Sequence, residues 1–277
     1  MTIIGAAIVP HGSMILPNDS ETVNEHAFKI HKAMNTLAKD IEEKKPEIIF
    51  LSTPHGLSLN HSFGIYLNSR ATGTAEWNNE YNEYKSSLVL DQEHSKNILE
   101  ELAIKHNFEG ITAYSKSIDA PLRWGEVVPT WFLKKINSKY IIVSQPARRQ
   151  NKALAMIDEL ISLGKDLGEY FESITEKVFV LISGDLAHTY QADGPYGKHS
   201  SAEPFDIAIE QWVKTLDSKY LLQEAGSLLN TALCCGYTGF VLLGGILESI
   251  QKSIVSEVLI NTHPTYYGMI VANFVIK

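Results

Sequence analysis

Residues 3–12, IIGAAIVPHG, and residues 48–56, IIFLSTPHG, share one pattern, in which a short apolar run ends in Pro-His-Gly. Short runs rich in β-branched residues are typical of buried strands, and proline and glycine mark the loops that follow them. Residues 27–45, between the two, carry apolar side chains at helical spacing, and Pro46 comes next. The order strand, helix, strand predicts two neighbouring parallel strands joined by a crossover helix, each with a histidine just beyond its end.

A third apolar run, residues 178–182, leads into Ser183, Gly184, Asp185 and, a little later, His188. The same patterns predict further strands at residues 63–67, 111–114, 140–144 and 269–275, and further helices at residues 94–106, 127–136, 153–171, 202–216, 221–229 and 237–253. Residues 75–84 show little periodicity, and Asn230 with Thr231 is expected to break the helical pattern. Without a long linker or an internal repeat, we expect one α/β domain over residues 1–277. Its central sheet should be mostly parallel and flanked by helices, with the site at the carboxyl ends of the strands.

Composition narrows the class of protein. The chain has 277 residues, 44% of them hydrophobic, and 24 basic against 32 acidic side chains give a net charge of -8. This balance argues against binding to nucleic acid or to anionic membranes. The apolar runs are shorter than the roughly 20 residues of a membrane span, and the first residues do not resemble a signal peptide, so we expect a cytoplasmic protein. Two adjacent cysteines do not suggest a disulfide framework, and the oligomeric state, including a homo-oligomer, stays open.

The histidines that follow the strands are the main functional signal. In open α/β sheets ligands bind outside the carboxyl ends of the strands, where His11, His55 and His188 are all expected. One such histidine would more often be an ordinary loop residue, but three together favour a metal site or a histidine acid–base site. The remaining seven are expected to be surface residues, with His199 and His263 kept as further candidates: His26, His31, His61, His94, His106, His199 and His263.

Two imidazoles and one anionic ligand would leave a metal ion an open coordination position for catalysis. Imidazoles suit iron, zinc and copper, and the anion can be a carboxylate or a thiolate. Cys235 stands just before the helix predicted at residues 237–253, where backbone amides and the helix dipole lower the pKa of a thiol. The alternative is that Cys234 and Cys235 are both small buried hydrophobes.

Taken together and in order, these motifs resemble the LigB superfamily over almost the whole chain. This superfamily includes the catalytic subunits of class III extradiol ring-opening dioxygenases and the Memo-like proteins. The motifs that carry the resemblance are Pro10-His11-Gly12, Pro54-His55-Gly56, the segment from Ser183 to His188, Gly194-Pro195-Tyr196-Gly197, and Cys235-Gly236.

The resemblance implies that His11 and His55 bind the metal and that His188 is the acid–base residue, with Asp185 as its local partner. In the dioxygenases the third ligand is a glutamate at the start of a late helix, and here the cysteine pair occupies that position. Memo-like relatives carry Cys-Gly there, which matches Cys235, whereas members with a glutamate just ahead of Cys-Gly would match Cys234. We prefer Cys235 as the third metal ligand.

A second departure from the ring-opening members concerns Trp124. Many of them place a further histidine in the segment that matches residues 123–129. An indole can stack on an aromatic substrate but cannot exchange protons at neutral pH. A core tryptophan is the alternative interpretation.

The sequence therefore leads to two functional hypotheses. The first is an extradiol-type dioxygenase that binds Fe(II) at His11, His55 and Cys235, and that opens a small catechol-like aromatic substrate with O2. The second is a Memo-like metal-binding or redox protein, holding zinc or copper, without ring-cleavage activity.

Overall fold

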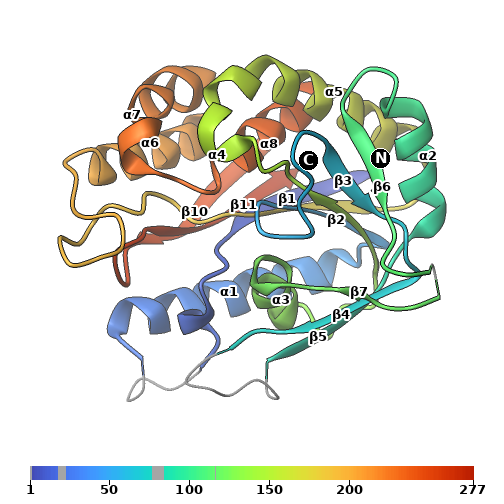
Figure 1. Cartoon of the computed structure of the whole chain (residues 1–277), viewed down its shortest axis with the longest axis horizontal. Helices are drawn as coiled ribbons and strands as arrows, with labels where there is room; N and C mark the ends of the chain where they lie inside the picture. The colour runs from blue at the N-terminus through green and yellow to red at the C-terminus, as the bar shows by residue number, and fades with distance from the viewer. Residues whose placement is uncertain (1, 18–22, 77–83, 116) are drawn as a thin grey trace.

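A computed structural model describes residues 2–17, 23–76, 84–115 and 117–277, which form one α/β domain (Figure 1). The central sheet has eight strands in the order β10-β11-β1-β9-β2-β8-β3-β6. Its strands are β1 (Ile3–Val9), β2 (Ile48–Thr53), β3 (Phe63–Tyr66), β6 (Phe108–Ile111), β8 (Lys139–Ser144), β9 (Val178–Ser183), β10 (Ile254–Thr262) and β11 (Met269–Ile276). A second sheet has the order β5-β4-β7 and consists of β4 (Arg70–Thr74), β5 (Lys85–Val89) and β7 (Ala120–Pro121).

Helices cover both faces of the central sheet (Figure 1). Helices α2 and α4–α8 lie on one face, whereas α1, α3 and the three-stranded sheet lie on the other. The α-helices are α1 (Glu25–Lys44), α2 (Gln92–Leu102), α3 (Trp124–Phe132), α4 (Arg149–Lys152), α5 (Ile157–Ser173), α6 (Ala202–Thr215), α7 (Gly226–Ala232) and α8 (Tyr237–Ser249). Within the described ranges, every helix falls short of the length or the apolar composition that crossing a bilayer requires.

The middle of the sheet is parallel, as predicted. Strand β9 pairs in parallel with β1 on one side and with β2 on the other, and β2 pairs in parallel with β8. Antiparallel pairs attach β11 to β1, β10 to β11 and β3 to β8. The expectation that the strands before the two Pro-His-Gly loops are neighbours is wrong, because β9 lies between them. All three histidine-bearing loops consequently leave the sheet side by side.

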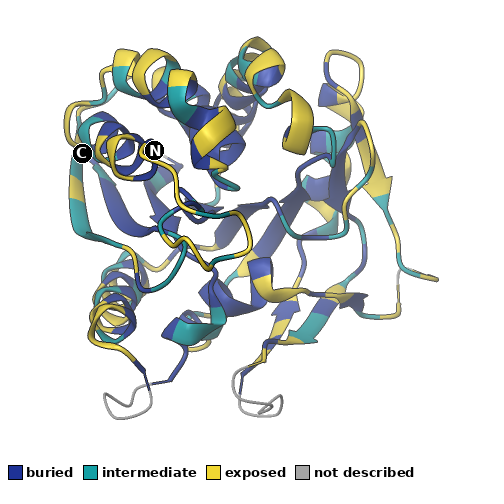
Figure 2. Ribbon diagram, turned by 60° about the vertical axis from the view of Figure 1, so that its left-hand side comes forward, coloured by how far each residue is buried: buried dark blue, intermediate teal, exposed yellow. Residues whose placement is uncertain are grey.

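The central strands are continuous apolar runs because both faces of the sheet are buried (Figure 2). In β9, Val178, Val180 and Ile182 pack against the side covered by α5 and α8, whereas Phe179 and Leu181 pack on the opposite side. Helix α1 covers this opposite side with one apolar stripe, at Ile30, Met34, Leu37 and Ile41. Because successive side chains of β9 pack into the hydrophobic layers on opposite faces of the sheet, the end of β9, where the next loop begins, is held from both sides.

Several element boundaries differ from the sequence predictions. Helix α1 begins at Glu25 because the Asn24 side chain accepts a hydrogen bond from the Ala27 amide. The strand predicted at residues 111–114 is β6, three residues earlier, since Tyr114 has a φ of 54° and is 98% exposed. Asn230 and Thr231 lie inside α7 and do not break it. Most of the segment predicted to be irregular, residues 75–84, lies outside the described residues.

The largest difference is at the C-terminal edge of the sheet. The helix predicted to reach Ser253 ends at Ser249, and the unpredicted strand β10 follows it. Two glycines of α8 allow close packing on different partners: Gly239 approaches Ile182 of β9, whereas Gly245 packs against Gly164 of α5. Helix α3 starts at Trp124 and ends at Phe132, earlier than the predicted range of residues 127–136 at both ends.

Candidate metal centre

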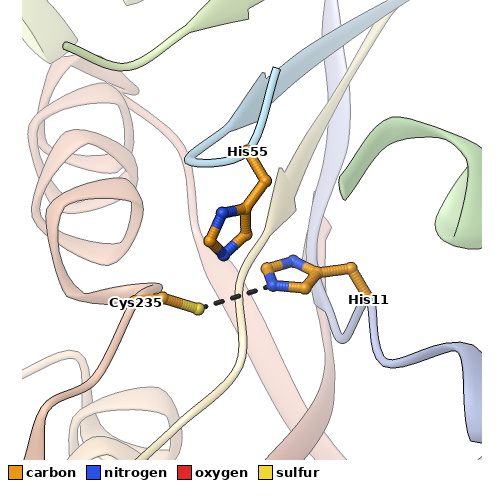
Figure 3. Close-up of side chains that lie close together, drawn as sticks. All are labelled: His11, His55 and Cys235. Carbon is orange, nitrogen blue, oxygen red and sulfur yellow. Dashed lines mark hydrogen bonds between the residues drawn. The ribbon is translucent and has the colours of Figure 1, made fainter. Parts of the chain in front are cut away.

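The loops after β1 and β2 and the segment before α8 bring His11, His55 and Cys235 together (Figure 3). One ligand atom from each lies within 4.8 Å of the other two. The Cys235 Sγ is 3.4 Å from the His11 Nε2, and the two imidazole centroids are 4.8 Å apart with their planes nearly perpendicular. Metal–ligand distances of 2.0–2.3 Å in a tetrahedral site put ligand atoms about 3.5 Å apart. This donor set therefore fits a transition-metal ion after small adjustments.

Hydrogen bonds fix which nitrogen of His11 faces the cysteine. The Ser183 hydroxyl donates to the Gly125 carbonyl at 2.6 Å, so its oxygen accepts from the Nδ1–H of His11 at 2.9 Å. The proton on Nδ1 leaves Nε2 with a free lone pair, which is what a metal ligand requires. Ser183, the last residue of β9, thus orients a histidine that follows β1.

Two glycines allow the cysteine segment to reach the sheet. A Cβ atom on Gly184 would lie 2.5 Å from the Cα of Gly236, a closer approach than two carbon atoms tolerate. The Gly236 amide donates to the carbonyl of Asp185, which ties the start of α8 to the loop after β9. A Cβ atom on Gly236 would in turn lie 2.9 Å from the Asp185 carbonyl oxygen and 3.0 Å from the Gly184 Cα, so the Gly of the Cys-Gly motif allows the close contact between the two segments.

A buried network of hydrogen bonds holds the loop that carries His55. The Leu57 amide donates to the Tyr66 hydroxyl, which in turn donates to Glu126 Oε1 at 2.8 Å. The other carboxylate oxygen accepts from the Arg123 amide at the start of α3. Burial raises the pKa of Glu126 to about 7 despite these bonds. Sequence reasoning did not single out Tyr66 or Glu126, because their role depends on a contact between distant loops.

Trp124 lies on His55 and is not a core residue. The two ring centroids are 5.0 Å apart with an interplanar angle of 32°, and Trp124 is 38% exposed to solvent. The Arg123 guanidinium stacks on the indole at 4.7 Å. Trp124 therefore forms an aromatic wall beside the candidate ligand.

The two cysteines differ in what their sulfur atoms contact. The Cys234 thiol donates to the Asp185 carbonyl at 3.1 Å, whereas Cys235 Sγ is the one beside His11. The expectation that the helix start lowers the pKa of Cys235 is wrong, because burial raises its pKa to about 12. The helix is capped by Gly236, and the Cys235 sulfur lies 3.8 Å from the Asp185 carbonyl oxygen. A bound metal ion would oppose this effect of burial by stabilising the thiolate.

His188 and Asp185, proposed as local partners, also border this group, and each forms its hydrogen bond with a different residue. The Nδ1–H of His188 donates to the Leu186 carbonyl at 2.8 Å, and the ring stacks on Tyr267 with an angle of 17° between planes. Asp185 instead accepts from the His11 amide, and its other oxygen lies 3.3 Å from His11 Nε2. Asp185, His188 and Cys235 form a second set whose ligand atoms lie within 4.8 Å of one another. The two sets share Cys235.

Burial keeps the imidazoles neutral. Desolvation lowers the pKa of His55 to about 3 and that of His188 to about 4, and it holds the pKa of His11 well below its ordinary value. Desolvation raises the pKa of Asp185 to about 7. We therefore regard the 3.3 Å contact between Asp185 Oδ2 and His11 Nε2 as a contact with a neutral imidazole and not as an ion pair. Neutral imidazoles are the form that binds metal ions.

A cavity of about 610 Å³ opens beside these residues. His55, His188 and Cys235 line it, and Arg149, Asn151 and Asn230 are among the other polar residues of its lining. The sequence analysis did not select Arg149, although it follows the end of a predicted strand by only five residues. The rule that residues just beyond the end of a strand line the site would have selected Arg149, but it would have selected the adjacent Arg148 as well.

Among the remaining histidines, two expectations are wrong. His31 and His106 are buried and not on the surface, with the His31 Nδ1 bonded to the Ile15 carbonyl and the His106 Nε2 to Asp166. His199 and His263 do border a cavity, but it is a separate one of about 460 Å³. Neither belongs to a metal-binding group among the described residues.

Comparison with known proteins agrees with this fold and shows the family. The chain matches the family described as the catalytic LigB subunit of aromatic ring-opening dioxygenase over residues 5–265. It therefore belongs to the LigB family. The chain is 26% identical over 266 residues to the protein CA_C1420 of Clostridium acetobutylicum, an alignment that covers 94% of this chain and 54% of that protein. The chain thus spans about half the length of this curated relative.

A solved structure shares the fold. The Escherichia coli K12 protein JW3007 superposes with a TM-score of 0.62 at 13% sequence identity, covering 98% of this chain and 99% of that one. At this identity the likeness concerns the arrangement of the helices and strands and not the activity.

Proposed function

We propose that this protein is a metal-dependent dioxygenase that opens a catechol-like aromatic ring with O2. The observation that carries the proposal is the convergence of His11, His55 and Cys235 beside a cavity that His188 also lines. Membership of a family described as aromatic ring-opening dioxygenase subunits supports the same reaction class.

In this proposal His11, His55 and Cys235 hold the metal, with Fe(II) as the first choice and zinc or copper as alternatives. Such an ion would lower the pKa of a bound phenol and bring the substrate and O2 together. Ser183 keeps the lone pair of His11 directed at the site, and Gly125 allows α3 to pack closely under His55. Trp124 and Tyr196 offer aromatic faces near the two histidines His55 and His188.

His188 is the proposed acid–base residue. Its Nδ1–H is engaged by the Leu186 carbonyl, so Nε2 is the atom that can accept a proton from a substrate hydroxyl and later return it. Because the pKa of His188 is lowered to about 4, the ring is neutral at pH 7 and ready to accept that proton. The stacking on Tyr267 restrains the ring in this orientation.

A Memo-like metal-binding or redox protein without ring cleavage is the second candidate. Two features favour it: the anionic member of the candidate ligand set is a cysteine and not a carboxylate, and Trp124 stands where many ring-opening members carry a histidine. A thiolate shifts the metal preference toward softer ions such as copper and zinc.

Metal analysis and oxygen uptake together test the proposal. Protein purified without added metal should contain one transition-metal ion per chain. After anaerobic loading with Fe(II), it should consume O2 with at least one member of a catechol panel and yield a ring-opened product visible by mass spectrometry. Stoichiometric zinc or copper, together with no catechol-dependent oxygen uptake, would favour the Memo-like candidate instead.

A further inference from the structure

A third cavity lies within the layer of helices that contains α5, α6 and α8 (Figure 1). It has a volume of about 110 Å³, and the segment Tyr220–Ala225 and the start of β10 complete its walls. Among the residues that the structure describes, those lining this cavity are all different from those lining the cavity beside the candidate metal ligands. The third cavity is therefore distinct from the candidate metal centre.

The lining of the third cavity is almost entirely apolar. Trp212 of α6 and Val241 of α8 lie on it, together with six leucine and isoleucine side chains. The polar members of the lining are Ser218 and Glu248, and the Glu248 carboxylate forms an ion pair with Lys165 at 2.9 Å. Because this charge is already paired, the lining favours an uncharged, apolar occupant.

Gly244 of α8 leaves space in this cavity. The nearest neighbours of a Cβ atom on Gly244 would be Leu221 Cδ2 at 3.6 Å and Trp212 Cζ2 at 3.8 Å, both ordinary contact distances to lining residues. In the same helix, Cβ atoms on Gly239 and Gly245 would lie only 2.8 and 2.4 Å from their nearest neighbours. Close packing thus explains those two glycines but not Gly244. Since glycine is less favourable than alanine inside a helix, the free space is the steric consequence that Gly244 leaves.

Two further features that cost stability border the same cavity. The segment Tyr220–Ala225, which supplies Leu221 and Leu222 to the lining, is a π-helix, a rare form that is frequent at functional sites. Leu216, which follows α6 and also lines the cavity, has a φ of 58°, in the left-handed region that glycine usually occupies at a helix end. Unfavourable backbone conformations cluster where ligands are held. Three such features around one small cavity indicate a site that is kept open for a ligand.

We propose that the third cavity is a binding site for a small, uncharged, apolar molecule. Apolar cavities of roughly 150 Å³ stay dry and bind benzene. A volume of about 110 Å³ therefore suits a ligand of roughly four to six non-hydrogen atoms, such as a short branched aliphatic group or a single unsubstituted ring. The inference is independent of the reaction proposed for the metal centre, because it rests on other residues and on another ligand class.

Benzene is the probe that tests this inference. Calorimetry in a sealed cell, on the protein as purified, should show saturable binding. Gly244→Ala adds one methyl group that makes only ordinary contacts, and it should weaken binding about fourfold or more, which is the effect of one methylene of buried apolar contact. Gly244→Val occupies more of the cavity and should abolish the saturable binding. Ser162→Val, which places the same side chain at an exposed position of α5, is the control and should keep the parent affinity.

Urea unfolding of each variant precedes the binding measurements. Gly244→Ala should be at least as stable as the parent protein, since alanine favours the helix, so this variant decides the test if Gly244→Val does not fold. No saturable binding to the parent protein up to the solubility of benzene would overturn the inference. Binding that the folded Gly244 variants leave unchanged would also overturn it, because the benzene would then occupy another place, such as the cavity beside the candidate metal ligands.

Discussion

Two polar cavities flank the loop that follows β9, and their buried groups are used differently. The first cavity is lined by His55, His188 and Cys235, which belong to the candidate metal-ligand sets. Arg149 also lines it, and the Nε of this residue is buried without a hydrogen-bond partner. The second is built around Asp206, which is 3% exposed and fully engaged. One Asp206 oxygen accepts from the Ala187 amide at 3.0 Å and the other from the Tyr190 hydroxyl at 2.8 Å.

The contrast separates groups held for a ligand from groups that hold the fold. In the second cavity His263 stacks on Tyr190 at a centroid distance of 4.1 Å, so its ring contacts protein. Asp206 reaches the backbone one residue before His188 and thereby supports the loop that the first cavity uses. Titratable residues and a concave surface occur in both places, but among the residues that the structure describes, candidate metal-ligand atoms converge beside the first cavity and not beside the second. We infer that convergence of unsatisfied groups marks the functional cavity.

Replacing a candidate metal ligand beside the first cavity should change metal content far more than replacing a histidine of the second cavity. His11→Ala and His55→Ala should each abolish metal binding under chelator challenge, because either change leaves at most two of the three ligands. Metal content per chain, determined by plasma emission spectroscopy, measures the effect. His263→Ala, in the second cavity, should retain the parent stoichiometry. Full metal content in both the His11 and His55 variants would place the metal elsewhere and remove the basis of the comparison.

His188→Ala should separate metal binding from turnover. The variant should keep its metal and lose roughly 10²- to 10⁴-fold in rate, because a positioned acid–base group contributes about that much. Oxygen uptake with the best catechol from the panel gives the rate, and His199→Ala is the control from the second cavity. Loss of metal in parallel with activity would instead make His188 a ligand, in the set that it forms with Asp185 and Cys235.

The cysteine pair offers the same contrast within two adjacent residues. Cobalt-substituted protein should show an intense sulfur-to-metal charge-transfer band that Cys235→Ser removes and Cys234→Ser preserves. The reason is that Cys235 Sγ faces His11, whereas the Cys234 thiol is engaged by the Asp185 carbonyl. The near-ultraviolet absorption spectrum of the cobalt-substituted protein reports the result. The opposite pattern would assign the ligand to Cys234, and no band in the parent protein would exclude sulfur from the site.

The parallel strands at the centre of the sheet were predictable, because strands that are buried on both faces are continuous apolar runs in the sequence. The runs that form β1, β2 and β9 are apolar throughout, and each ends in a proline or glycine near a histidine. Strand β10 was missed because most of its residues are only half-buried, so its pattern lacks both a clear alternation and a continuous run. The strand order was missed for a different reason. Sequence adjacency favours β1 beside β2, but β9 joins from more than 120 residues away.

The candidate site was predictable in its residue types and not in its hydrogen bonds. His11, His55, His188 and Cys235 follow from strand ends and from the resemblance to the LigB superfamily. The partner of Asp185 did not follow, because the loop after β9 turns its carboxylate toward His11 and its neighbour's carbonyl toward His188 Nδ1. Nor could the sequence separate Arg149 from Arg148, since the two are adjacent and only their contacts in the folded chain differ: Arg149 lines the cavity, whereas Arg148 pairs with Glu159.

The smallest effect that we expect concerns the second cavity, and it tests whether Asp206 serves the fold. Burial raises the pKa of Asp206 from 3.8 to about 7, so the folded protein retains a proton there that the unfolded chain releases near pH 4. The folded state therefore binds more protons than the unfolded state between about pH 4 and pH 7. Its free energy of unfolding must fall, from this group alone, as the pH rises through that window.

Asp206→Asn removes this titration while keeping an oxygen that can accept from the Ala187 amide. The stability of the variant relative to the parent protein should therefore increase from pH 4 to pH 7, by roughly 1–3 kcal/mol. Urea unfolding of both proteins after chelator treatment, at several pH values across this window, measures the difference. Glu203→Gln, which removes an exposed carboxylate from the same helix and the same cavity, is the matched control. A relative stability of Asp206→Asn that stays constant with pH would mean that Asp206 is already ionised in the folded protein. The second cavity would then also hold an uncompensated charge, and the distinction between the two cavities would be lost.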